Sequence, residues 1–282
     1  MKILKTINTI VFFVILTKSA SAQHLQYSNF NVQVDYKMTY RPDSNNSDTQ
    51  HEYMELLIND RESIFQSLKR YRLDSATYAS KTGGNSVPFG FISDNFTKIR
   101  YYITKFGDSI ITRDEYKLAR YQDYHYYVEH RKDFDWRVMD DTTTISGILC
   151  QRAELDFGGR RWVAWFSPEV PIPDGPYKFC GLPGLILNIG DSTGSWRFDF
   201  LGLKSIERQI VPVYDRENPP PFTKKRKFLK EKKYYNENRL TIEEAAGTIR
   251  YRDNEERAAD IKVSRERAAK DNNWIELLGS ED

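Results

Sequence analysis

The sequence predicts a mainly β protein, in which a curved antiparallel sheet of eight or more strands is followed by a C-terminal helical tail. Aromatic residues are frequent, with 18 Tyr, 16 Phe and 5 Trp, and such residues suit pleated, half-buried surfaces. Short stretches of alternating polarity recur between polar turns that contain Gly or Pro. A curved sheet of this kind can close partly on itself as a half-barrel, which would shelter an apolar ligand.

Residues 1–22 are expected to be a secretory signal peptide rather than part of the fold. Lys2 and Lys5 form a basic start, the run from Ile7 to Leu16 is largely apolar, and Ala20-Ser21-Ala22 offers a cleavage site before Gln23. The apolar run is about half of the roughly 20 residues that span a bilayer. We therefore expect export to the periplasm or cell envelope, with an uncleaved membrane anchor as the alternative.

Signal removal changes the charge balance of the chain. The segment holds three of the 42 basic groups and no acidic one, which leaves 39 basic against 40 acidic groups. A nearly neutral chain is not drawn to nucleic acid by its overall charge. We therefore expect no nucleic-acid partner.

Residues 23–215 are expected to form one antiparallel β domain. The stretches Val32 to Tyr40 and Glu52 to Ile58 alternate or concentrate apolar residues, and the polar segment 41–50 should be the loop between them. A turn at Asn59-Asp60 leads to a further strand at 63–66.

The middle of this domain begins with a polar segment, residues 67–95, that is interrupted by Gly and Pro and predicts a long excursion. Strand composition resumes from Phe96 to Phe106, and Gly107-Asp108 turns the chain back. Further strands are expected near residues 121–128 and 135–139.

The clearest hairpin spans residues 150–167. Gly158-Gly159 supplies the two positive φ angles of a type I′ turn. In the resulting register Phe157 faces Arg160, and Cys150 falls opposite Ser167.

Residues 168–184 carry five prolines, so this segment cannot be a central strand. Leu182 to Leu185 predicts a type II turn, with Pro183 first and Gly184 at the position that needs a positive φ. A buried strand from Leu185 to Ile189 should follow, then a turn at 191–194 and a strand over 195–206.

Residues 216–282 are expected to form a Pro-rich linker, a basic segment and a helical tail. Phe222 to Lys233 holds seven basic groups and one acidic group. Thr241-x-x-Glu244 predicts a capping box that opens a short helix, and residues 252–270 should form a solvated helix.

One dense block of Gly and Pro is the most distinctive feature of the chain. Its structural signature consists of Gly175, Pro176, Gly181, Leu182, Pro183, Gly184, Leu185 and Ile186. The surrounding motifs are Trp136, Ile145-Ser146-Gly147, Cys150, Arg152-Ala153, Gly159-Arg160, Ala164-Trp165-Phe166, Pro168-Glu169, Pro171-Ile172 and Tyr177-Lys178-Phe179. Together they resemble the GLPGLI family of exported Bacteroidota proteins, which has no settled biochemical role. The ending Asn272 to Leu277 is similar to the family's Asn-Pro-Ile-Glu-Leu tail, and the resemblance implies an association with TonB-dependent outer-membrane systems.

Cys150 and Cys180 are candidates for a disulfide, because an oxidising compartment permits one. Closing a loop of about 30 residues would stabilise the fold by roughly 3–4 kcal/mol. Two free thiols that pack as small apolar groups are the alternative. Within the resemblance, Cys180 replaces a residue that is more often polar, so this bond would belong to this member rather than to the fold.

Few patterns predict catalysis, and none predicts a metal or a cofactor. His24, His51, His125 and His130 form no HExxH motif, and the two cysteines lack zinc-site spacing. No G-x-S-x-G nucleophile or phosphate-binding loop occurs. We therefore expect neither a metal nor a cofactor.

A hydrolase is the alternative to a non-catalytic protein. Glu169 and Asp174 lie near Tyr177 in the Pro-rich loop, where two carboxyl groups could act as general acid and base. The competing interpretation is that Asp174 shapes the turn into Gly175-Pro176 through hydrogen bonds to its own backbone. We expect the second, so that the loop is architecture rather than a reactive centre.

The function that these observations favour is a non-catalytic envelope protein that binds a ligand or partner, in association with an outer-membrane uptake or assembly system. The basic segment could contact anionic lipid, lipopolysaccharide or an acidic partner. Its first basic residues are Lys224, Lys225, Arg226 and Lys227, and its expected apolar anchors are Phe222, Phe228 and Leu229. A solvated linker is the alternative.

Overall fold

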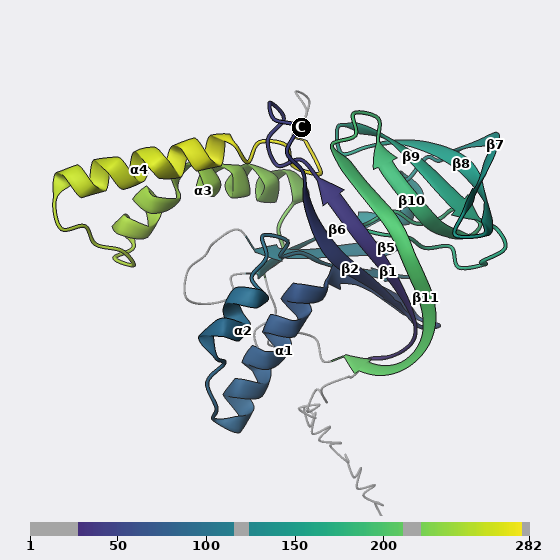
Figure 1. Ribbon diagram of the computed structural model, residues 1–282, viewed down its shortest axis with the longest axis horizontal. Coiled ribbons are helices and arrows are strands. Elements are labelled where there is room, and N and C mark those ends of the chain that lie inside the picture. Colours follow the sequence, from purple (N-terminus) through teal and green to yellow (C-terminus); the bar gives the residue numbers. More distant parts are fainter. Residues whose placement is uncertain (1–27, 116–123, 211–220, 278–282) are drawn as a thin grey trace, which may run out of the picture.

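The computed structural model describes residues 28–115, 124–210 and 221–277 (Figure 1). The expected signal peptide and its cleavage site lie outside these ranges. Within them, eleven strands form one antiparallel sheet in the order β6-β5-β4-β3-β2-β1-β11-β10-β9-β8-β7. The sheet does not close into a barrel, because β6 and β7 remain separate edges. The prediction of an antiparallel β fold with C-terminal helices is confirmed.

The strands follow one another along the chain as two meanders. The first contains β1 (Ser28–Tyr40), β2 (Gln50–Ile58), β3 (Glu62–Ser67), β4 (Tyr102–Phe106), β5 (Ser109–Glu115) and β6 (Tyr124–His130). The second contains β7 (Arg137–Ile145), β8 (Ile148–Phe157), β9 (Arg160–Ser167), β10 (Leu185–Asp191) and β11 (Trp196–Ile210). The helices are α1 (Leu68–Gly83), α2 (Phe89–Asp94), α3 (Lys225–Ala245) and α4 (Asn254–Ala269).

One pair of long strands joins the two meanders. β1 pairs with β11 from Ser28↔Ile210 to Tyr40↔Trp196, with register shifts at two points. β11 is strongly bent over this length (Figure 1). The bend gives the sheet the curvature that the sequence predicts.

The hairpin of β8 and β9 has the predicted register, in which Phe157 pairs with Arg160. Its two turn residues, Gly158 and Gly159, have φ angles of 60° and 72°. These are the positive angles that a type I′ turn requires, so this prediction is confirmed.

Residues 67–95 form the predicted excursion from the sheet, between β3 and β4, but they contain two helices, α1 and α2, that the sequence did not predict. Ser67 caps α1 by accepting a hydrogen bond from the backbone N–H of Arg70, at 3.2 Å. Gly84 ends the helix with a φ of 75°. α1 lies against the outer face of the sheet, beside a small apolar cluster that includes Phe30 and Tyr71.

The predicted capping box at Thr241 is wrong, because α3 already runs from Lys225 through this position. The only non-helical φ/ψ pair inside α3 is at Asn238, where φ is −120°. α4 begins where Asp253 accepts hydrogen bonds from the backbone of Glu255 and Glu256. Together α3 and α4 form an arm that projects from the sheet (Figure 1). In the described ranges, no helix combines the length and apolarity that crossing a bilayer requires.

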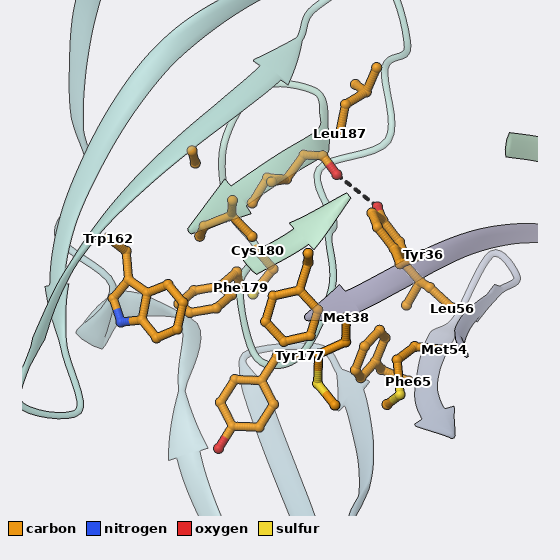
Figure 2. Close-up of a cluster of buried hydrophobic side chains, with 14 of the residues drawn as sticks. Tyr36, Met38, Met54, Leu56, Phe65, Trp162, Tyr177, Phe179, Cys180 and Leu187 are labelled. Carbon is orange, nitrogen blue, oxygen red and sulfur yellow. Dashed lines mark hydrogen bonds between the residues drawn. The ribbon is translucent and has the colours of Figure 1, made fainter. Parts of the chain in front are cut away.

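The main core lies on the concave face of the sheet, and residues 168–184 fill it. We call this segment the signature loop. Tyr177, Phe179 and Cys180 from the loop are buried beside Trp162 of β9 and Met38 of β1 (Figure 2). A ligand in a half-barrel would therefore have to displace this loop.

Candidate functional site

The signature loop is held to the sheet by its own backbone. The N–H of Leu185 bonds to the carbonyl of Val170 at 2.9 Å, and that of Ile186 to Asp174 at 3.0 Å. Tyr36 of β1 donates to the carbonyl of Ile186 at 2.7 Å, as Figure 2 shows. The first two bonds join the loop to β10, and the third joins β10 to β1.

The predicted type II turn at Leu182 to Leu185 is wrong. Gly184 does not have a positive φ, whereas Gly181 does, at 93°. Gly184 is needed for another reason, since a Cβ at this position would lie 2.0 Å from the carbonyl oxygen of Ser167. The glycine therefore permits two backbone segments to touch.

Two lysines are completely buried at the loop, Lys105 of β4 and Lys178 of the loop itself, and the sequence analysis predicted the burial of neither. Lys105 of β4 forms an ion pair with Asp174 and donates to the carbonyl of Gly175 at 2.6 Å. Ser63 of β3 donates to the second carboxylate oxygen of Asp174 at 2.5 Å. Asp174 therefore fastens the loop to the first meander.

The second buried lysine, Lys178, lies in a balanced cluster of four charges. Its ammonium contacts Glu276 and lies 2.5 Å from the carboxylate of Glu129. Lys225 at the start of α3 contacts the same two carboxylates. Tyr177 completes the group by donating to Glu276 at 2.5 Å. We call these five residues the lysine–glutamate cluster.

Burial by itself would raise the pKa of Glu276, because it disfavours the charged form. The neighbouring ammonium groups of Lys178 and Lys225 outweigh burial and lower the pKa of Glu276 from 4.5 to about 2. Burial opposes the charge of Lys178 too, but Glu129 and Glu276 raise its pKa. Glu276 and Lys178 are therefore both ionised around pH 7.

Glu276 should make the stability of the protein depend on acid. Its folded-state pKa lies below the unfolded value, so its contribution is fully present above pH 4.5 and is lost as the pH falls towards 2. We expect wild type to exceed Glu276→Gln in free energy of unfolding by roughly 3 kcal/mol at neutral pH. Urea titrations across this window should show the difference shrinking, and a difference that stays constant would contradict the assignment.

The segment Asp271–Leu277, which we call the C-terminal strap, crosses the end of the β8–β9 hairpin. Arg160 binds it by donating to the side chain of Asn273 at 2.6 Å and to the carbonyl of Trp274 at 2.5 Å. The same guanidinium pairs with Asp191 at 2.9 Å. Arg160 is thus a buried residue that joins the strap to β9 and β10.

The tight turn of the hairpin makes room for the strap. A Cβ on Gly158 would lie 2.8 Å from Cγ of Glu276, and one on Gly159 would lie 3.0 Å from Cβ of Leu277. The N–H of Leu277 donates to the carbonyl of Gly158 at 2.8 Å. These glycines therefore serve both the turn and the close approach of the strap.

The three residues of the hydrolase hypothesis do not converge. Glu169 is exposed on the surface. Asp174 is buried and accepts a hydrogen bond from the N–H of Gly175 at 2.7 Å, while Tyr177 is buried against Glu276. Asp174 thus points into its own turn, and it also anchors the loop to Lys105.

One surface hollow lies elsewhere, at the β8–β9 turn. It is lined by Asp156, Phe157, Gly158, Gly159, Arg160, Arg161 and Ser192. Arg161 pairs there with Asp156 at 3.1 Å. None of the three residues of the hydrolase hypothesis lines this hollow. Among the residues in the described ranges, no three His, Cys, Asp or Glu side chains gather as metal ligands would.

The disulfide prediction is not supported, because Cys150 and Cys180 are both free and buried. Cys180 packs in the main core, where Figure 2 shows it beside Phe179. Burial raises the pKa of both thiols. A buried, protonated thiol is a poor nucleophile.

We expect both thiols to resist modification in the folded protein. Ellman's reagent should react slowly with the native protein and should titrate two thiols in denaturant. The unreduced protein should also have the mass of the dithiol form. Rapid native reaction, or a mass two hydrogens lower, would contradict this arrangement.

The basic segment is divided by the structure. Lys225 belongs to the lysine–glutamate cluster, and Phe228 is fully buried, so neither is available to a partner as the sequence suggested. Lys224, Arg226 and Phe222 are exposed. The anchor role expected for Phe228 is therefore wrong, because this ring packs against Tyr127 of β6.

Comparisons with known proteins match the signature loop most directly. Residues 159–188 match the family described as protein of unknown function (Porph_ging). No curated protein matches the chain. The matched segment contains Arg160, Asp174, Tyr177 and Lys178, the residues that hold the loop and the strap.

Solved structures show only a distant likeness. Two crystal forms of PNGF-II share 10% and 12% sequence identity, with TM-scores of 0.47 and 0.45 over 72% of this chain. The chain covers 32% and 33% of those structures, so it spans about a third of PNGF-II. A DUF1329 family protein from Desulfovibrio piger shares 10% identity with a TM-score of 0.20, over 63% of this chain and 86% of that one. At these scores the likenesses carry no argument about activity.

Proposed function

We propose that this protein is a non-catalytic binding or assembly factor of the cell envelope. The observation that carries the proposal is that polar residues of the matched segment 159–188 are bound to other parts of the fold. Asp174 binds Lys105, Tyr177 binds Glu276, and Arg160 binds the C-terminal strap. Polar groups engaged in this way brace a scaffold, whereas a catalytic site needs some of them directed into an open cleft.

Exposed apolar side chains support a binding role. Phe89 of α2 is 84% exposed, and Phe91, Ile92 and Phe96 around it are exposed as well. An exposed apolar group of this kind is typical of a surface that meets a partner. Because the signature loop fills the concave face, a protein partner is favoured over an apolar ligand in a half-barrel.

The signal-like segment 1–22 supports export, and the resemblance to GLPGLI proteins supports an outer-membrane, TonB-dependent system as the partner. A contact between two motifs of this resemblance is also present in the structure. Lys178 in the Tyr-Lys-Phe motif contacts Glu276 in the tail motif, although the two residues are 98 positions apart. Two separate parts of the resemblance thus meet in one cluster.

Photo-crosslinking in intact cells tests the proposal. A photoreactive residue at Phe89 is expected to yield a defined adduct with an outer-membrane protein, identified by mass spectrometry. The matched control places the same residue at Lys262, an exposed position on α4. Processing at Gln23 should be confirmed from the mature N-terminus. The absence of an outer-membrane adduct from correctly exported protein would overturn the proposal.

A further inference from the structure

The basic residues of α3 fall into two groups with different surroundings. Lys225 pairs with Glu129 and Glu276, and Lys232 pairs with Asp114 of β5. Arg226, Lys230 and Lys233 are exposed, and in the described part of the chain they form no ion pair. Some cations of α3 therefore form ion pairs with the sheet and the strap, whereas others are exposed at the surface.

The unpaired cations lie on one side of the helix. At 100° per residue, Arg226, Lys230 and Lys233 fall within about 60° of one another. The buried Phe228 and Tyr235 lie on the opposite side. Lys227 lies next to these cations on the helix surface. Its ammonium is 3.6 Å from the carboxylate of Glu231, and this ion pair is weak because both side chains are exposed to solvent. We call Arg226, Lys227, Lys230 and Lys233 the basic face.

Exposed aromatic rings accompany the basic face. Tyr234 on the same side of α3 is 63% exposed, and Phe222 just before the helix is 59% exposed. Cations with neighbouring aromatic rings are typical of helices that lie on anionic bilayers, where rings enter the headgroup region and cations meet phosphates. α4, in contrast, exposes cations and acids together, such as Lys262, Arg265 and Glu266.

We infer that the basic face of α3 docks on an anionic, phosphate-bearing lipid surface. This inference rests on the proposed envelope location and names a second contact besides a protein partner. The positive charge of the face complements the lipid phosphates. Lipid headgroups move laterally, so one phosphate can come to each of the separate cations along the helix. The carboxylates of a protein have fixed positions and would have to match the spacing of the cations. The projection of the α3–α4 arm from the sheet leaves this helix accessible (Figure 1).

Vesicle flotation of the full mature protein tests this inference. Binding is expected to vesicles that contain phosphatidylglycerol but not to pure phosphatidylcholine, and it should weaken as salt rises. Each cation near an anionic leaflet strengthens binding about fivefold, so R226Q/K230Q/K233Q should weaken it on the order of 100-fold. The matched control, K262Q/R265Q/K270Q, removes the same charge from α4 and its C-cap residue, Lys270, and should bind within a few-fold of wild type.

Both triple variants change exposed side chains, so their unfolding midpoints should match that of wild type. Equal losses in the two variants would overturn the inference, because they would reflect net charge alone. Retention on immobilised poly-L-glutamate without vesicle binding would also overturn it and would point to an acidic protein. If the wild-type protein does not bind phosphatidylglycerol vesicles but the crosslink at Phe89 is formed, the lipid contact is refuted and the proposed function stands.

Discussion

Lys178→Met is expected to lower the free energy of unfolding by about 3–5 kcal/mol, the cost of breaking a buried ion pair by removing one partner. Methionine retains much of the length and apolar surface of lysine, so the cavity contribution should be small. The buried Glu276 and the partly buried Glu129 would then share Lys225 as the cation that contacts both of them. Urea denaturation followed by tryptophan fluorescence measures the loss.

Lys204→Met provides the matched control for this substitution. Lys204 also pairs with a carboxylate, Asp35 at 3.3 Å, but its side chain is 55% exposed. The control should therefore lose less than about 1 kcal/mol. The double variant Lys178→Met/Glu276→Gln should lose less free energy of unfolding than the sum of the two single variants. Each single change leaves a buried charge without its partner, and the second change removes that charge. Equal losses in Lys178→Met and Lys204→Met would contradict the role of the cluster.

Gly184→Ala is expected to be the second severe change, with a loss of about 3 kcal/mol or more, at the upper end of what overpacking costs. The new Cβ would lie 2.0 Å from the carbonyl oxygen of Ser167 and 2.9 Å from the nitrogen of Pro168. Neither is the tip of a flexible side chain, so β9 and the loop would have to separate. The same urea titration, or expression yield if the protein fails to fold, measures the effect.

Gly181→Ala, in the same motif, tests the second reason for a glycine, which is a positive φ angle rather than close contact with a neighbouring segment. A Cβ at Gly181 would have no heavy atom within 4 Å, but its φ is 93°. This conformation should cost an alanine roughly 1–2 kcal/mol. If Gly181→Ala proved as damaging as Gly184→Ala, the close contact at Gly184 would not be what sets the cost of substitution in this motif.

Much of the sheet could be predicted because hairpins are local. Gly158-Gly159 specifies both the turn and the pairing of Phe157 with Arg160, and alternation over Val32 to Tyr40 reports one buried face. α1 was missed because it lies on the surface and its apolar side is narrow. Its end signals, Ser67 and Gly84, were present in the sequence.

The buried charges could not be predicted from composition or spacing. Lysine is rarely buried, and the partners of Lys105 and Lys178 lie 69 and 98 positions away. Only the fold brings such distant residues together. The interpretation of the signature loop as architecture stays a prediction. The role predicted for Gly184 was wrong, because Leu-Pro-Gly-Leu matches a turn pattern and the approach of Ser167 leaves no local signal.

The pairing of β1 with β11 has a kinetic consequence. Tyr40 and Trp196 are 156 positions apart, and Ser28 and Ile210 are 182 positions apart. Each meander can begin from neighbouring hairpins, but this seam closes only after a large loop-entropy cost, which slows folding. Until it closes, two long strand edges stay open to pairing with other chains. Aggregation during refolding should therefore grow with protein concentration and should be suppressed by a peptide that copies β11.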